Sequence, residues 1–314
     1  MSAVTGRFAP SPSGRLHLGN LACSLLAWLS ARSHGGRIVL RIEDLDAERC
    51  PRKYADALEE DLRWLGLFWD EGGSHGGPNG PYYQSECADI YTRSYKQLEA
   101  QGLIYPCFCS RAQLHAASAP HTSDGNVIYP GTCRGLTAEQ IAEKRKKKAP
   151  AYRLMVPDED ITFTDGCMGP HTENLLHDCG DFYLRRADGV FAYQLAVVVD
   201  DARMGCDGGG AGRGPALFHR PAALSLSSAG PAAPKFAQLS APAGPGWPPP
   251  FQTGRGPEPG KPAGKVYGGR DHGQACLCLR PSARTGPRTP ESLIADFSWD
   301  KVPKQDVCLP ENLF

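Results

Sequence analysis

The sequence predicts an α/β fold built on a parallel sheet, and three neighbouring stretches carry that prediction. A short apolar strand near residues 5–8 runs into a Pro/Ser/Gly turn at 10–14. Apolar residues then recur at helical spacing, so we expect a helix over about 16–35. A second apolar strand follows at 37–44. Because strands joined by such a crossover are parallel, Glu43 at the end of the second strand should lie beside the turn.

Composition narrows the class of protein. The 314 residues are 41% hydrophobic, which is enough to bury a real core in one large or two ordinary domains. The first residues show no signal-peptide pattern, and no stretch approaches the length of a membrane helix, so we expect a cytoplasmic protein that does not bind membranes. The net charge of zero means that any RNA contact must depend on a local basic patch. The run Lys144–Lys148 is either such a patch or a solvated helix end.

The turn and the start of the first helix are suited to binding phosphate. His17 and Asn20 fall on one side of the first helical turn, where unpaired backbone N–H groups also point. The alternative is a capped core helix with a polar first turn. The run Arg-Phe-Ala-Pro-Ser-Pro-Ser-Gly at 7–14 favours the first reading, because it resembles the first signature of class I aminoacyl-tRNA synthetases. The form is that of glutamyl-tRNA synthetases and the shorter glutamyl-Q tRNA(Asp) synthetases.

Two further blocks resemble the same family. These are Arg-Ile-Glu-Asp-Leu-Asp at 41–46 and Gly-Pro-Tyr-Tyr-Gln-Ser at 80–85. From the residues alone Glu43 could be a plain strand-end carboxylate, whereas the resemblance implies that it contacts the α-amino group of glutamate. The resemblance implies that ATP is held by His17, Gly19 and Asn20, of which His17 and Asn20 are the catalytic candidates. The implied glutamate-binding residues are Arg7, Phe8, Ala9, Pro10, Ser11, Glu43 and Tyr193.

A hairpin is expected near the end of the family-like region. Residues 181–186 and 190–201 alternate or run apolar around an Asp-Gly turn at 187–189, so we expect two strands. The second arm resembles a family strand that returns to the nucleotide-binding sheet. In that strand the residue corresponding to Tyr193 lines the amino-acid pocket.

A cysteine cluster predicts a small metal-binding insert. Cys107-Phe-Cys109 and, about twenty residues later, Cys133 could supply three soft ligands to zinc, with reduced core cysteines as the alternative. The residues alone leave the fourth ligand open, since His115 and His121 are unplaced loop residues. The glutamyl-Q enzymes pair Cys-x-Cys with Tyr-x-x-x-Cys, so the resemblance implies one structural Zn²⁺ on Cys107, Cys109, Tyr129 and Cys133.

The composition changes sharply after residue 205. Residues 206–287 contain 16 Gly and 14 Pro in 82 positions, with no Ile or Met and only ten Leu, Val or Phe. Such a segment cannot build a core, and we expect it to be disordered. The family's second glutamate-binding arginine and its KMSKS-type lysine loop are not present there as motifs; only 234–239 resembles a family fragment. We hypothesise a frameshifted reading of the gene, with a genuine insertion as the rival.

The expected organisation has five parts. Residues 1–104 and 151–205 form the class I, Rossmann-like catalytic domain, 105–150 the zinc-binding insert, 206–287 the anomalous segment and 288–314 a family-like tail.

The implied activity is tRNA-independent activation of L-glutamate with ATP and Mg²⁺, then transfer to queuosine in the wobble position of tRNA(Asp) by a monomer. The shorter family is preferred because there is no room for an anticodon-binding region. The alternatives are an inactive zinc- and RNA-binding remnant and a truncated glutamyl-tRNA synthetase acting on tRNA(Glu).

Overall fold

A three-stranded parallel sheet, with strand order β1-β2-β3, organises the first part of the chain. The computed structural model describes residues 4–16, 18–114, 128–165, 169–206, 208–212, 235–239 and 289–302. The strands are β1 (Thr5–Phe8), β2 (Arg37–Leu40) and β3 (Glu71–Gly72). Thr5 pairs with Arg37 and Phe8 with Leu40, which confirms the predicted parallel crossover.

Two helices connect these strands and build the first core. Helix α1 (Leu18–Ser33) joins β1 to β2, and α2 (Arg52–Trp64) lies between β2 and β3. The apolar side of each helix packs on the sheet; Leu29 and Leu58, for example, are buried in one cluster with the strand residues. The sequence predicted α1, and α2 begins directly after its N-cap residue Pro51. Short 3-10 turns follow at Gly73–His75 and Gln84–Glu86.

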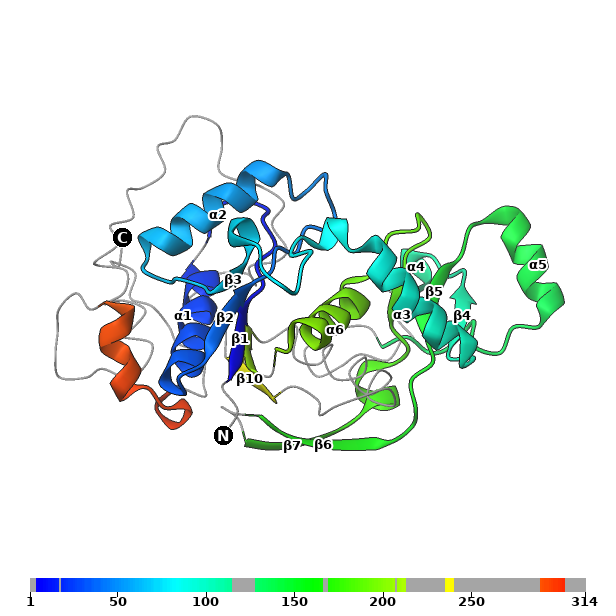
Figure 1. Cartoon of the computed structure of the whole chain (residues 1–314). Coiled ribbons are helices and arrows are strands. Elements are labelled where there is room, and N and C mark those ends of the chain that lie inside the picture. The colour runs from blue at the N-terminus through cyan, green and yellow to red at the C-terminus, as the bar shows by residue number, and fades with distance from the viewer. Residues whose placement is uncertain are drawn as a thin grey trace.

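A second core forms around α3 (Ala88–Ala100) and an antiparallel sheet of order β4-β5-β8. Its strands are β4 (Ile104–Cys107), β5 (Ala151–Leu154) and β8 (Tyr183–Arg185). Figure 1 shows β1–β3 with α1 and α2 at one end of the molecule, and α3 with β4 and β5 toward the other. None of the helices within the described ranges is long and apolar enough to cross a membrane.

The predicted second hairpin arm is wrong. Tyr193–Met204 forms helix α6, and only a bridge between Arg185 and Phe191 remains of the expected strand pairing. The turn at 187–189 is present, with the Arg186 N–H donating to the Val190 carbonyl at 2.8 Å. Valine disfavours helix by only about 0.5 kcal/mol, whereas burying an apolar side chain contributes about 1.5–3 kcal/mol. Burial on nearly every side of α6 therefore outweighs its β-branched composition and hides its helical period.

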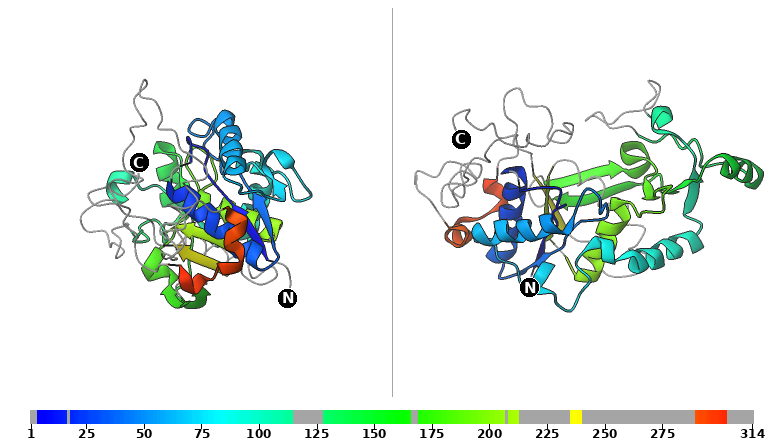
Figure 2. Two further views of the ribbon diagram at one scale, coloured as in Figure 1. Left: turned by 90° about the vertical axis from the view of Figure 1, so that its left-hand side faces the viewer. Right: turned by 90° about the horizontal axis from the view of Figure 1, so that it is seen from above.

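The insert and a long ribbon extend from the second core. The insert carries α4 (Arg111–Leu114) and α5 (Ala138–Lys147), which begins with a capping box at Thr137. Helix α5 buries none of its residues and projects at the end of the molecule away from the C-terminal turns (Figures 1 and 2). Strands β6 (Asp160–Asp165) and β7 (Gly169–Asn174) pair antiparallel and lead into a π-helical turn at Leu175–Cys179.

Two strands lie in the segment that we expected to be disordered. Strand β9 (Gly208–Gly212) pairs in parallel with β10 (Lys235–Leu239), and β9 lies beside β1 and α1. The sequence did not indicate β9 because strand pairing uses backbone groups, and a glycine run has no side chains to reveal an alternating face. Residue 207 and ranges 213–234 and 240–287 lie outside the described residues, so the prediction of disorder is not tested there.

The family-like tail packs onto the first core. Short helical turns form at Pro290–Asp296 and Trp299–Lys301. Leu293 is buried in the cluster that contains α1 and α2, and the Trp299 indole N–H donates to the Ser30 hydroxyl at 3.2 Å. Residues 289–302 of the tail are therefore part of the folded body, although more than eighty residues separate them from α6.

Truncating Leu293 tests whether this tail stabilises the fold. We expect Leu293→Ala to lower the free energy of unfolding by about 2–5 kcal/mol, because it removes a buried side chain and leaves a cavity. Urea denaturation measures the loss, with Glu291→Ala, at an exposed position of the same turn, as the control. Equal stability of the two variants would show that the tail does not dock as described.

Candidate functional site in the parallel sheet

The ends of β1 and β2 bring the predicted recognition residues together. The Arg41 N–H donates to the Phe8 carbonyl at 2.8 Å, and the Glu43 N–H donates to the Pro10 carbonyl at 3.1 Å. These bonds extend the pairing of the two strands past their ends and fix Glu43 against the turn that follows β1. The predicted proximity of Glu43 and this turn is confirmed.

A buried ionic network joins these strand ends to α6. The Arg7 Nε lies 2.8 Å from Asp201 Oδ1, and Arg41 Nη1 donates to the same oxygen at 2.5 Å. Arg41 Nη2 also donates to Glu43 Oε1 at 2.9 Å. All four side chains are buried, and Arg41 is fully enclosed. Asp201 therefore orients Arg7, while Arg41 ties Asp201 to Glu43.

Asp200, the neighbouring carboxylate on α6, anchors the helix to the surrounding elements. Its Oδ2 accepts hydrogen bonds from Gln84 Nε2 at 3.0 Å and from the Tyr91 hydroxyl at 2.7 Å, and its Oδ1 accepts one from Arg203 Nε at 2.8 Å. Because Asp200 and Asp201 are adjacent, these bonds also fix where Asp201 can meet Arg7. In low-dielectric surroundings a buried carboxylate has to accept several hydrogen bonds, as Asp200 does here.

Sequence reasoning missed Arg41, Asp200 and Asp201. Arg41 stands two residues before Glu43, so strand alternation places both side chains on one face, and this signal was available. The sequence pattern places the two aspartates at the end of a predicted strand, because it does not indicate that α6 is a helix. Their approach to Arg7, nearly 200 residues earlier, is set by packing that no local pattern reports.

In this network, burial and the neighbouring positive charges shift the pKa of Glu43 in opposite directions. Burial raises the pKa of Glu43 above its ordinary value, although the charges of Arg41 and Arg7 act in the opposite direction. Burial also raises the pKa of Tyr193, the first residue of α6, and the charges of Glu43 and Arg7 influence it as well. The structure thus brings Tyr193 close to the other glutamate-binding candidates.

Two of the three nucleotide-binding candidates occupy the start of α1. Gly19 and Asn20 lie in its first turn, and Asn20 is half-buried. His17 lies outside the described residues, so its predicted place beside Asn20 is not tested. Ala9 and Pro10 are half-buried and Ser11 is exposed in the turn between β1 and α1.

The cysteine cluster has the dimensions of a tetrahedral metal centre. The three sulfur atoms of Cys107, Cys109 and Cys133 lie within 4.8 Å of one another, and the last two are 3.7 Å apart. The Tyr129 hydroxyl oxygen is 3.5 Å from the Cys107 sulfur and 3.7 Å from the Cys109 sulfur. A zinc–sulfur bond of about 2.3 Å in a tetrahedron separates its ligands by roughly 3.8 Å. These four side chains therefore fit one tetrahedral ion.

Three separate segments position these groups. Cys107 ends β4, Cys133 lies in a turn, and Tyr129 forms a parallel bridge with Gly180. Gly180 has a φ of 70°, and a Cβ there would lie 2.9 Å from Ile128 Cγ2, so glycine permits this close pairing. The bridge holds Tyr129 at the cysteines.

Burial and hydrogen bonding shift the thiol pKa values of Cys107 and Cys109 in opposite directions. Burial alone would raise the pKa of the Cys107 thiol, but hydrogen bonding with the Tyr129 hydroxyl and with the backbone at Cys109 holds this pKa below its ordinary value. Burial raises the pKa of Cys109 to about 11. The surroundings of Cys107 thus favour its anionic form, which a metal ligand requires.

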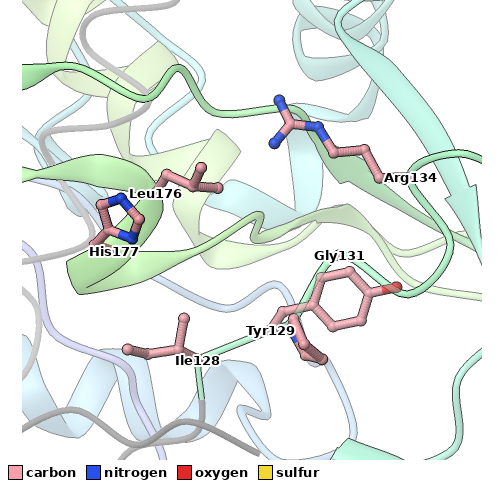
Figure 3. A pocket seen from close by; sticks show the side chains of 7 residues that line it. Ile128, Tyr129, Gly131, Arg134, Leu176 and His177 are labelled. Carbon is pink, nitrogen blue, oxygen red and sulfur yellow. The ribbon is translucent and has the colours of Figure 1, made fainter.

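A pocket of about 390 Å³ lies beside the cluster. Figure 3 shows Arg134 and His177 reaching toward it from different sides, with Ile128 and Leu176 adding apolar surface. The Arg134 guanidinium donates to the Val156 carbonyl at 3.1 Å, so it also braces the loop after β5. The pocket opens between the insert and the π-helical turn at Leu175–Cys179.

Comparison with known protein families matches residues 3–207 to tRNA synthetases class I (E and Q), catalytic domain. The chain belongs to this family. The matched region contains β1–β8, the insert and α6, and hence both the ionic network and the cysteine cluster. It ends at residue 207, close to the point where the composition changes.

Individual relatives of this synthetase family support the assignment. The chain is 56% identical over 206 residues to a glutamyl-Q tRNA(Asp) synthetase of Symbiobacterium thermophilum, covering 64% of this chain and 63% of that protein. It is 50% identical over 205 residues to glutamate–tRNA ligase 1 of Halorhodospira halophila, covering 64% and 43%. A glutamate tRNA ligase from Elizabethkingia meningosepticum, solved with its amino acid, is similar with a TM-score of 0.78 and 27% identity, covering 99% of this chain and 68% of that one. The sequence matches thus span less than two thirds of the curated relatives.

Proposed function

We propose that the chain activates L-glutamate with ATP, without tRNA present, and transfers it to queuosine in the wobble position of tRNA(Asp). The observation that carries this proposal is the buried network of Arg7, Asp201, Arg41 and Glu43, which presents a cation and an anion at the ends of adjacent parallel strands. An amino acid with an acidic side chain needs a cation to bind its side-chain carboxylate and an anion to bind its ammonium group. The glutamyl-Q name of the relative from Symbiobacterium thermophilum supports the choice of acceptor.

Arg7 is suited to the side-chain carboxylate of the substrate. Its Nε faces Asp201, while its Nη2 is buried and has no hydrogen-bond partner among the described residues. A buried guanidinium nitrogen without an acceptor is costly, and a carboxylate ligand would supply the acceptor. Glu43 would meet the ammonium group, with Phe8, Ala9, Pro10, Ser11 and Tyr193 completing the pocket.

The chemistry proposed for this site is adenylate formation. An oxygen of the substrate's α-carboxylate attacks the α-phosphorus of ATP, the bond to the β-phosphate oxygen breaks, and pyrophosphate leaves. The nucleophile is already ionised, so the protein positions the reactants and stabilises phosphate charge rather than removing a proton. In this proposal Gly19, Asn20 and His17 hold the nucleotide, whose phosphates carry Mg²⁺.

We further propose that one structural Zn²⁺ is bound by Cys107, Cys109, Tyr129 and Cys133. The distances among these four side chains support it, and a closed set of four protein ligands is typical of structural rather than catalytic zinc. The ion would join β4 to the segment around Tyr129.

Metal analysis tests the zinc proposal. Purified protein is expected to contain about one zinc per chain, and Cys109→Ser to lose most of it, because one of the four ligands is removed. Cys179→Ser, which changes another half-buried cysteine outside the cluster, should keep its zinc. Substoichiometric zinc that Cys109→Ser leaves unchanged would contradict the proposal.

The similarity to glutamate–tRNA ligase 1 of Halorhodospira halophila favours a second candidate, transfer of glutamate to tRNA(Glu). Incorporation of labelled glutamate distinguishes the two when measured with tRNA(Asp) containing queuosine, the same tRNA lacking it, and tRNA(Glu). We expect labelling of the first tRNA alone. Labelling of tRNA(Glu) would select the ligase, and tRNA(Asp) binding without glutamate activation would indicate an inactive remnant.

The composition of the anomalous segment, residues 206–287, lowers the reaction rate that we expect for this chain. We propose that the 314-residue chain is a slow enzyme, because residues 206–287 contain neither the family's second glutamate-binding arginine motif nor its lysine-loop motif. Losing one group that stabilises phosphate charge typically costs about 10²–10³ in rate. Reading the gene in all three frames across this segment, and comparing pyrophosphate exchange by the chain with that of a frame-restored version, tests this. Equal exchange rates would contradict it.

A further inference from the structure

Arg153 occupies the middle of the antiparallel sheet behind the cysteine cluster. It pairs with Tyr105 of β4 on one side and with Tyr183 of β8 on the other. Residues opposite one another in adjacent strands share a face of the sheet, and so do residues two apart in one strand. Cys107, two residues after Tyr105, therefore shares the face of Arg153.

The Arg153 guanidinium is stacked between two tyrosines. Its central carbon lies 3.7 Å from the ring centroid of Tyr129 and 3.7 Å from that of Tyr183. Nη1 donates to the backbone carbonyl of Asp181 at 2.5 Å, and the side chain also interacts with the Cys107 sulfur. Two of the four proposed zinc ligands, Tyr129 and Cys107, thus contact one arginine.

This arginine is a buried cation without a carboxylate partner. Only 4% of Arg153 is exposed, and among the described residues its Nε has no hydrogen-bond partner and its side chain makes no ion pair with a carboxylate. The carboxylate of Asp181 instead accepts from the Tyr105 hydroxyl at 2.6 Å and the Val156 N–H at 2.8 Å, and it lies 3.8 Å from Nη1 of Arg134. Enclosing a guanidinium in this way is costly unless an anion lies nearby.

We propose that the anion is the loaded metal centre, and that Arg153 is its positioning residue. This rests on the zinc proposal above. Three thiolates and a phenolate outweigh the two positive charges of Zn²⁺, so the loaded centre is anionic and buried. Arg153 offsets that charge and holds the Tyr129 ring at the ion. Lys148, whose Nζ lies 3.2 Å from the Cys109 carbonyl, is exposed and contributes less.

Two substitutions of Arg153 and a matched control test this role. Arg153→Leu is expected to weaken zinc binding by about 10- to 100-fold, as is typical when a group supporting metal ligands is lost. Arg153→Lys keeps the charge without the planar stacking and should weaken binding less. Arg185→Leu removes another arginine of the same sheet, which lies over Phe191 and away from the cluster, and should leave affinity unchanged.

The measurements separate positioning from a general structural role. Zinc affinity is measured by competition with a chromophoric chelator, and Co²⁺-substituted protein reports thiolate coordination through its charge-transfer absorption. Weaker affinity with an altered Co²⁺ spectrum in Arg153→Leu, partly restored in Arg153→Lys, is the expected result. Zinc affinity that is unchanged in both variants would overturn the inference. The same holds if the variants lose stability but lose it equally with and without metal, because zinc affinity is then unchanged. If the unsubstituted chain binds no zinc, the zinc proposal itself fails, which is a separate outcome.

Discussion

Replacing Arg41 by methionine is expected to lower the free energy of unfolding by about 3–5 kcal/mol. The change leaves Glu43 and Asp201 buried without the guanidinium that joins them, and Asp200, whose carboxylate lies 3.8 Å from Arg41, loses a nearby charge as well. Methionine has similar length, so the loss of charge rather than of volume should dominate. Urea denaturation monitored by circular dichroism measures the effect.

A surface ion pair supplies the control. Arg15 pairs with Asp61, but its side chain is 74% exposed, so Arg15→Met should cost no more than about 1 kcal/mol. A loss for Arg41→Met as small as that of the control would show that the network does not hold the strand ends and α6 together.

Arg7→Ala and Glu43→Ala are each expected to reduce glutamate-dependent activation by about 30-fold or more while leaving ATP binding largely intact. Each change removes a proposed charge-assisted contact to the amino acid, worth about 2 kcal/mol or more, and neither residue is assigned to the nucleotide. Pyrophosphate exchange at varied glutamate concentrations measures the loss, and nucleotide binding is measured separately.

Arg63→Ala provides the comparison for these variants. Arg63 lies on α2 and pairs with Glu59, away from the network, so this variant should exchange normally. A variant of Arg7 or Glu43 that activates glutamate as well as Arg63→Ala does would refute its assignment to the substrate.

The fold was predictable where local pattern and tertiary packing agree. The crossover from β1 through α1 to β2 combines a clear helical period, turn residues and two apolar strands, and the structure confirms it. Helix α6 was not predicted, because its valines favour strand while burial on nearly all sides removes the polar face that identifies a helix. Its helical form depends on contacts with distant elements, which the local sequence does not contain.

The candidate site likewise contains features that the local sequence predicts and features that only tertiary packing decides. Glu43 could be placed beside the turn after β1 because parallel connectivity fixes which strand ends meet. The Arg41–Asp201 contact could not, since it requires the orientation of α6. The cysteine cluster was recognisable from spacing, and the structure brings its three sulfurs and the Tyr129 hydroxyl together. The sandwich around Arg153 depends on the register of β4, β5 and β8, which alternation alone leaves open.

Amino-acid-dependent pyrophosphate exchange without tRNA tests the proposed activity most directly. The 314-residue chain is assayed with L-glutamate, L-glutamine, L-aspartate and D-glutamate, beside Arg7→Ala. We predict slow exchange that requires L-glutamate and disappears in Arg7→Ala, because in the proposed site Arg7 of β1 and Glu43, which follows β2, together select an amino acid with an acidic side chain. Absence of glutamate-dependent exchange, equal exchange with L-glutamine, or exchange that survives in Arg7→Ala would contradict the account.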